Sequence, residues 1–104
     1  MSREALSIWS EIVEEARKAL TLAMAGVQGS GEIKASLSRL ADLFETWLSL
    51  VPPNVRNRVV YAFTPYGTLT IRYMELPKLF REAAKTGYIS PTVAFILNII
   101  AESM

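Results

Sequence analysis

The chain is 104 residues long, 51% hydrophobic and 20% charged, so it can form one domain around a single core and is not intrinsically disordered. It has no cysteine and no histidine, which excludes disulfides, thiolate nucleophiles, Cys/His zinc sites and imidazole acid–base catalysis. Residues 1–53 hold five bases and seven acids, a net −2, whereas residues 54–104 hold six bases and three acids, a net +3. We therefore expect any anionic partner to meet the second half of the chain.

The sequence contains no segment typical of a membrane anchor or a secretory signal. The longest apolar run, VAFILNIIA, is far shorter than the roughly 18–20 residues of a membrane span. The first residues, MSREALSIWSE, include acids and lack an apolar stretch. These features predict a soluble cytoplasmic protein, and the absence of cysteine is consistent with a thermophilic source.

Residues 2–26 predict an amphipathic helix. Ser2 is placed to cap its start, and Gly26 to end it through a left-handed conformation. Apolar side chains recur at helical spacing, at Trp9, Ile12, Val13, Ala16, Leu20, Ala23 and Met24. This stripe indicates a helix with one face in the core.

The following stretch, GVQGSGEIK, is predicted to be a helix–helix connector. Its glycines resemble those of a phosphate-binding P-loop, but Glu32 stands where that loop has a lysine. Gly26 and Gly29 also give the GXXG form of the RNA-binding KH loop. Both folds place a strand before the loop, whereas here a helix precedes it, so the connector interpretation is preferred.

A second helix is expected from about Gly31 to Val51, where the pair Pro52-Pro53 ends it. Its apolar face consists of Ile33, Leu37, Leu40, Phe44, Trp47, Leu48 and Val51, widened by Leu43 and Leu50. Because the glycine connector is short, we expect the first two helices to pack antiparallel. The wide face indicates burial against more than one neighbour.

The stretch from Arg56 to Tyr73, RNRVVYAFTPYGTLTIRY, predicts a β-hairpin between helices. Pro65 and Gly67 suit a three-residue loop with a bulge, which sets Thr64 opposite Thr68. This register assigns one face to the core, namely Val59, Tyr61, Phe63, Leu69, Ile71 and Tyr73. The same register leaves the opposite face of the hairpin available to a partner, namely Arg58, Val60, Ala62, Thr70 and Arg72.

A short helix is the alternative for the first half of this stretch. Asn54 would cap it, and Val55, Val59 and Phe63 would form its apolar side. In that case TLTIRY would be a strand without a partner, which favours the hairpin.

Two further helices are predicted after the hairpin. In ELPKLFREAAKTG, Pro77 suits the first helical turn and Gly87 the end; in SPTVAFILNIIAESM, Ser90 suits the cap and Pro91 the first position. The last helix is apolar on nearly every side, so it is either the central core helix or a contact to another subunit. Together the elements predict a single domain, residues 1–104, that is a mainly α bundle of four to five helices with one inserted β-hairpin.

The turn between these last helices resembles the DNA-binding helix-turn-helix over about twenty residues. The residues that match its pattern are Ala83, Gly87, Thr92, Val93, Ile96 and Leu97. The positions that would face the DNA groove are Ile89, Ser90, Pro91, Ala94, Phe95 and Asn98. Among these only Asn98 is of a type that reads base edges, and the helix has no basic residue. We therefore interpret the turn as helix–helix packing geometry and keep a small helix-turn-helix regulator as an alternative.

The acidic residues predict no active site. Most of them occupy polar positions of amphipathic helices, where solvated charges are common. Glu11 with Glu14 or Glu15 could hold a cation, but one acidic pair on one helix is a weak metal signal. We therefore predict that the protein is not an enzyme and has neither a metal site nor a cofactor.

Basic and aromatic residues of the second half are the candidate nucleic-acid contacts. They are Arg56, Arg58, Arg72 and Tyr66 on the hairpin or its approach, and Lys78, Arg81 and Lys85 along one face of the next helix. Guanidinium groups bridge phosphate oxygens, and an exposed ring stacks on an unpaired base. The pattern predicts non-specific binding to a DNA or RNA backbone.

In size, element order and the stretch RNRVVYAFTPYGTLTIRY, this cysteine-free chain resembles the small subunit of archaeal type I-A CRISPR interference complexes. The resemblance spans most of the chain. It implies a non-enzymatic protein of antiviral defence that is repeated along a ribonucleoprotein and contacts other protein subunits. There it would support the guide–target duplex and the displaced DNA strand through Arg56, Arg58, Arg72, Lys78, Arg81 and Lys85. The near-neutral net charge departs from this pattern, since nucleic-acid subunits are often more basic.

A second alternative is a structural or self-assembly protein, for example of a virus. Its apolar C-terminal helix would then be the contact between copies. In that interpretation the hairpin aromatics belong to the core and the cations serve only solubility.

Overall fold

The computed structural model describes residues 1–103 as a mainly α fold with one β-hairpin, which confirms the predicted fold class. Its five α-helices are α1 (Arg3–Met24), α2 (Gly31–Leu50), α3 (Pro53–Arg56), α4 (Leu76–Thr86) and α5 (Pro91–Ala101). The strands are β1 (Val59–Thr64) and β2 (Gly67–Arg72), and the 3₁₀ turn η1 (Tyr73–Glu75) joins β2 to α4. None of the helices in residues 1–103 has both the length and the apolar character that a membrane crossing requires.

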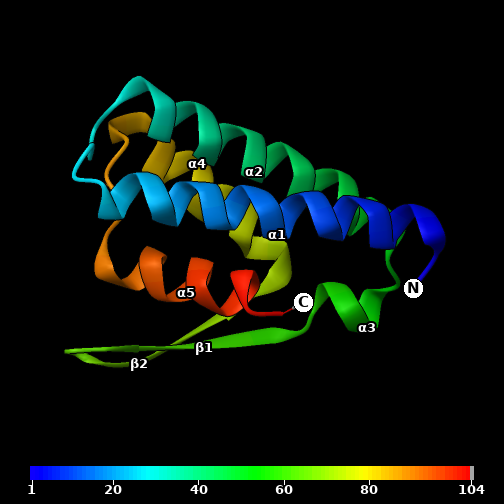
Figure 1. The fold of residues 1–104 in the computed structure, drawn as a ribbon. Coiled ribbons are helices and arrows are strands. Elements are labelled where there is room, and N and C mark those ends of the chain that lie inside the picture. The colour runs from blue at the N-terminus through cyan, green and yellow to red at the C-terminus, as the bar shows by residue number, and fades with distance from the viewer. Residues whose placement is uncertain (104) are drawn as a thin grey trace.

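The long helices α1 and α2 run antiparallel, as predicted, and the remaining elements pack around them (Figure 1). α4 packs on α2, whereas α5 packs on α1. The hairpin lies along α5, on the side away from α2, and its tip points away from α3 (Figure 1). The hairpin is therefore attached to the bundle along one face only.

Local signals in the sequence set the helix ends. The hydroxyl groups of Ser2, Ser30 and Ser90 each accept a hydrogen bond from the backbone N–H three residues further on, which caps α1, α2 and α5. Gly87 ends α4 in the left-handed conformation, with φ of 71°.

A four-residue helix, α3, does form before the hairpin, but it begins at Pro53 and ends at Arg56, with Asn54 inside it. The alternative of a helix capped by Asn54 that runs through Val59 and Phe63 is therefore wrong, because β1 occupies these positions.

The apolar C-terminal helix belongs to the core. Ile96, Leu97 and Ile100 of α5 are at most 2% exposed, whereas Ile99 is 36% exposed. α5 packs against α1 on one side and β1 on another. This packing uses most of the apolar surface on which the self-assembly alternative depended.

The connector between α1 and α2 holds the turn between α4 and α5. The side-chain amide of Gln28 donates to the carbonyl of Ile89 (3.0 Å) and accepts from its N–H (2.9 Å). The N–H of Gly29 donates to the carbonyl of Gly87 (2.9 Å). Ile89, which the helix-turn-helix alternative places in the DNA groove, is only 3% exposed. The turn therefore packs into the protein at this position.

The register of the hairpin differs from the predicted one by one residue. Thr64 pairs with Gly67 and Phe63 with Thr68, so the loop consists of Pro65 and Tyr66 alone. A shift of one residue moves each side chain of a strand to the opposite face. The predicted pairing of Thr64 with Thr68 is wrong, and so is the assignment of faces on β1.

The face of the hairpin that packs on the bundle carries small and branched side chains. Val60, Ala62 and Ile71 are 5%, 0% and 7% exposed, and Val60 pairs directly with Ile71. Ala62 allows β1 to approach α5 closely because its side chain is a single methyl group. Ile71 is thus a core residue as predicted, whereas Val60 and Ala62 were wrongly assigned to the partner face.

Candidate nucleic-acid interface

Two aromatic residues predicted to be core lie on the outward face of the hairpin. Tyr61 is 60% exposed and Phe63 is 67% exposed, and they are two residues apart on β1. Their cross-strand partners are Thr70 and Thr68, so Arg72, which pairs with Val59, continues the same face. The outward face thus combines two exposed rings, two threonines and one guanidinium group.

The tip of the hairpin presents a third ring on an ordered turn. Tyr66 is 99% exposed. The hydroxyl group of Thr64 donates to the carbonyl of Gly67 (2.7 Å) and accepts from the N–H of Tyr66 (3.2 Å), which closes the turn. Pro65 fixes its own φ and removes one donor from the loop. The structure therefore places Tyr66 where the sequence predicted it, at the exposed tip.

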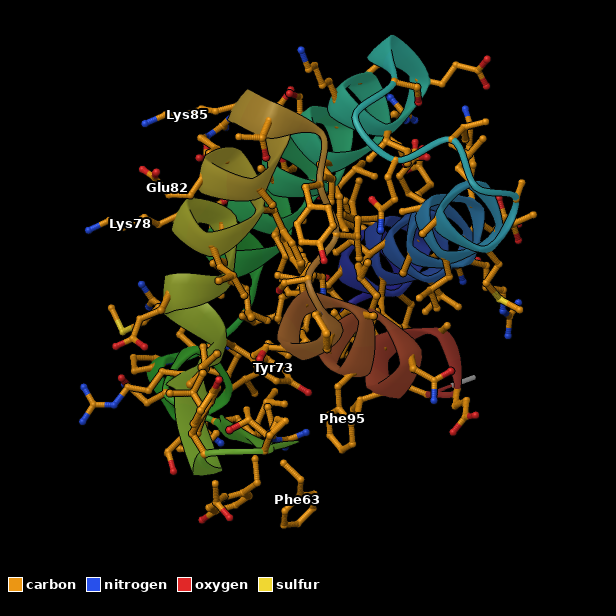
Figure 2. All side chains as sticks on the ribbon, turned by 90° about the vertical axis from the view of Figure 1, so that its left-hand side faces the viewer. Phe63, Tyr73, Lys78, Glu82, Lys85 and Phe95 are labelled. Carbon is orange, nitrogen blue, oxygen red and sulfur yellow. The ribbon has the colours of Figure 1, made fainter. Side chains whose placement is uncertain are left out.

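Phe63 of the outward face makes an aromatic contact with the bundle. Its ring centroid lies 5.8 Å from that of Phe95 on α5, with the planes at 85°, an edge-to-face contact (Figure 2). The contact covers only part of Phe63, because two thirds of the residue remains exposed. Phe95 therefore orients the ring of Phe63 and leaves one of its surfaces accessible.

The three hairpin arginines do not share one face. Arg56 is the last residue of α3 and is exposed. Arg58 precedes β1, and its carbonyl accepts a hydrogen bond from the N–H of Tyr73 (2.9 Å). Two residues before Val60, its side chain lies on the same side of the strand as Val60 and faces a cavity beside Tyr73. Arg72 lies on the opposite, outward side. The predicted common face of Arg58 and Arg72 is therefore wrong, because it depended on the wrong register.

The predicted basic face of α4 is neutralised by neighbouring acids. Arg81 donates from Nη2 to Asp42 (2.7 Å) and to Glu45 (2.7 Å), and from Nε to Glu45 (3.0 Å). These hydrogen bonds raise the pKa of Arg81 above its ordinary value. Lys85 pairs with Glu82 at 3.2 Å.

Counting the acids around the three α4 cations gives no net charge on this face. Lys78, Arg81 and Lys85 contribute +3, and the acids beside them, Asp42, Glu45 and Glu82, contribute −3. Lys78 and Lys85 project from one side of α4 with Glu82 between them (Figure 2). Within residues 1–103 Lys78 makes no ion pair, so it alone of these three cations resembles the exposed charge that the spacing predicted.

Two of the acidic residues of α1, Glu11 and Glu15, make contacts within the protein. Glu15 is 7% exposed, accepts a hydrogen bond from the hydroxyl of Ser36 (3.0 Å) and pairs with Arg39 (3.1 Å). Arg39 also reaches Glu11 (3.4 Å). Across residues 1–103, no three acidic side chains are grouped closely enough to hold a metal ion. Glu11 and Glu15 therefore link α1 to Ser36 and Arg39 of α2.

An aromatic cluster at the open end of the hairpin was missed by reasoning from the sequence. Trp9 of α1, Trp47 of α2 and Tyr73 of η1 have ring centroids 4.8–6.3 Å apart. Burial raises the pKa of Tyr73, and the nearby charge of Arg58 lowers it by less. The two tryptophans were assigned to helical core stripes, and no spacing along the chain indicates that they meet Tyr73.

Comparison with known proteins adds no relative. No family model, no curated protein and no solved structure matches this chain.

Proposed function

We propose that this chain is a non-enzymatic subunit of a nucleoprotein assembly and that its hairpin holds single-stranded nucleic acid without sequence preference. The observation that carries this proposal is the exposure of Tyr61 and Phe63, 60% and 67%, on the same outward face as Arg72. Exposed aromatic rings stack on unpaired bases, and guanidinium groups bind the adjoining phosphates. A folded protein gains nothing from leaving two neighbouring large rings in water, so the arrangement favours a partner with flat faces and negative charge.

The charges of the hairpin favour a nucleic-acid partner over an acidic or neutral protein surface. Residues 54–74 contain Arg56, Arg58 and Arg72 and no acidic residue. None of these arginines makes an ion pair within residues 1–103. Since stacking and phosphate contacts do not depend on base identity, the expected binding is tolerant of sequence.

Three available arginines favour a role inside an assembly rather than tight binding by one copy. Affinity that comes from so few phosphate contacts is moderate and falls with salt. Several copies in a row, or a neighbouring basic subunit, would raise it through effective concentration. This agrees with the resemblance to the small subunit of archaeal type I-A CRISPR interference complexes, in which the protein is repeated along the guide–target duplex and the displaced strand.

A titration of labelled single-stranded and duplex oligonucleotides by fluorescence anisotropy tests the proposal. We expect oligothymidylate and oligouridylate to bind more tightly than duplex DNA at low salt, and the double variant Tyr61→Ala/Phe63→Ala to bind at least about fivefold more weakly. Tyr88→Ala removes a ring that is 54% exposed outside the hairpin and should bind as the wild type does. Equal affinity of the double variant and the wild type would contradict the proposal.

The same titration separates the alternatives. Absence of binding at low salt, together with oligomers that grow with protein concentration, would favour self-assembly through the rings of Phe63 and Phe95. That second function has its own support in the exposed apolar surface formed by Tyr61 and Phe63 on the outward face of β1 and by the contact of Phe63 with Phe95. A tight preference for one duplex sequence would favour the helix-turn-helix regulator.

A further inference from the structure

A cavity opens at the end of the hairpin that is opposite its tip. Its volume is about 580 Å³, within the range of small-molecule sites. Side chains from α1, α2, α3 and η1 line it, as do residues close to both ends of the chain, Ser2 and Ser103. The cavity is therefore formed where the hairpin joins the bundle.

The walls of this cavity are aromatic. Trp9, Trp47 and Tyr73 all line it. The rings of Trp9 and Tyr73 are nearly parallel, with planes at 16° and centroids 6.3 Å apart, so they pack on each other and leave too little space for a third ring between them. Both rings are partly exposed, whereas Trp47 is 1% exposed. Trp9 and Tyr73 therefore offer exposed aromatic surface to a ligand, and the buried ring of Trp47 packs against both of them.

The polar groups of the cavity favour a ligand that is anionic. Arg58 lines the cavity, and no acidic residue of the described chain does. A nucleotide fits this charge and the aromatic walls, because its phosphate is negative and its base is flat.

The cavity lies next to the proposed strand-binding face but on the inward side of the hairpin. Arg58 lies three residues before Tyr61, about 10 Å along an extended chain. Because its side chain follows the inward alternation of Val60, a strand that comes from the outward rings has to pass around the end of the hairpin to reach it. A nucleic-acid backbone that follows the hairpin towards α3 would therefore reach Arg58 and the cavity mouth next.

We propose that this cavity receives one base of the bound single strand, packed against the exposed part of the aromatic wall formed by Trp9 and Tyr73, with the adjoining phosphate at Arg58. This inference rests on the proposed function and assigns a second, enclosed contact to the same strand. The base is selected for its shape and flatness. The site thus anchors the strand at the open end of the hairpin while the outward rings hold the neighbouring bases.

Intrinsic fluorescence reports on this cavity directly, because the chain has two tryptophans, Trp9 and Trp47, and both line it. The titrant is end-labelled oligothymidylate, so that anisotropy measures binding of the strand and tryptophan emission measures entry of a base. The protein is used without a tag at either end, since Ser2 and Ser103 line the cavity. We expect quenching that saturates at the same concentration as the anisotropy.

Two controls separate the base from the backbone and the cavity from the hairpin. An abasic oligomer of the same length should leave tryptophan emission unchanged. Val55→Phe places a larger side chain in the cavity wall and should remove the quenching while the strand still binds the hairpin. Val27→Phe, a comparable change in the α1–α2 connector at a valine that is 39% exposed, should quench as the wild type does.

The outcomes distinguish this inference from the proposed function. Saturating anisotropy with unchanged tryptophan emission would overturn the base site and leave the hairpin function standing. Absence of any strand binding would overturn both. Quenching by thymidine monophosphate without binding of any oligomer would also overturn both, and would indicate a site for a free nucleotide.

Discussion

Arg81 of α4 donates hydrogen bonds to Glu45 of α2 from two nitrogens, Nε at 3.0 Å and Nη2 at 2.7 Å, and the same Nη2 lies 2.7 Å from Asp42. α2 and α4 form one of the main helix contacts of the bundle, so this guanidinium group joins two packed elements. A cation that is held by two carboxylates is a poor ligand for phosphate, because the phosphate would have to compete with them. Arg81 is therefore structural in our interpretation, although its spacing along α4 suggested a binding role.

This relationship predicts opposite effects for two arginine substitutions. Arg81→Gln should lower the midpoint of urea unfolding, because it leaves Asp42 and Glu45 close together without a cation, and should leave oligonucleotide affinity unchanged. Arg72→Gln should lower the affinity and leave the unfolding midpoint unchanged. Circular dichroism in urea and anisotropy with oligothymidylate measure the two quantities. A loss of affinity in Arg81→Gln as large as that in Arg72→Gln would show that the α4 cation binds the strand.

Gly87 is a position where any side chain should destabilise the fold. Its φ is 71°, and a Cβ atom there would lie 2.9 Å from Cγ of Lys34 and 3.1 Å from the backbone of Gly29. We expect Gly87→Ala to reduce the free energy of unfolding by about 1–2 kcal/mol from the left-handed backbone alone. Gly31→Ala is the matched control, since a Cβ atom at Gly31 meets nothing within 4 Å. Equal stability of Gly87→Ala and the wild type would contradict the packing of the two turns.

The register of the hairpin can be tested by two neighbouring substitutions. Ala62 is fully buried beside α5, so Ala62→Leu should overpack this contact and reduce the free energy of unfolding by about 1–3 kcal/mol. Tyr61→Leu changes an exposed side chain and should alter stability little. Urea denaturation of both variants decides between the observed and the predicted register, because the predicted register reverses the two results.

The sequence predicted the helices well because their signals are local. Serine caps, prolines in first turns and the glycine after α4 are each recognised within a few residues of the helix end that they set. The apolar stripe of α2 likewise identified its buried residues, including Phe44 and Trp47. Such features depend on neighbours one helical turn away, which a single sequence contains.

The faces of the hairpin could not be predicted in this way. Pro65 and Gly67 fit a loop of two or of three residues, and one residue of difference exchanges the inward and outward sides. The choice between them depends on packing against α5, where Ala62 fits and a large ring would not. The pairing of Arg81 with Glu45 has the same origin, because the two residues are 36 positions apart and meet only in the folded protein.

Because of Tyr73, the stability of the fold should vary with pH in the alkaline range. Burial raises its pKa in the folded protein above the ordinary value near 10, so the folded state holds this proton when the unfolded chain has released it. Its stabilising contribution is therefore complete below about pH 10 and is lost as the pH rises through the folded-state pKa. Tyr73→Phe should lose less stability than the wild type above pH 10.

Urea unfolding midpoints between about pH 8 and 11 measure this difference. Arg58→Gln offers a second check, because the charge of Arg58 lowers the pKa of Tyr73 and its removal should raise that pKa further in a tyrosinate absorbance titration. Parallel loss of stability in Tyr73→Phe and the wild type would contradict the burial of this hydroxyl group.

The salt dependence of binding should show how many of the hairpin arginines neutralise a phosphate. If Arg56, Arg58 and Arg72 each neutralise one phosphate of a single strand, the logarithm of the association constant should fall against the logarithm of the salt concentration with a slope of about −2. Each single Arg→Gln variant should make the slope less negative by about 0.7, because one fewer counterion is released. Lys18→Gln removes an exposed cation of α1 and should leave the slope unchanged. A slope that is the same in the wild type and in all three arginine variants would place the phosphate contacts outside the hairpin.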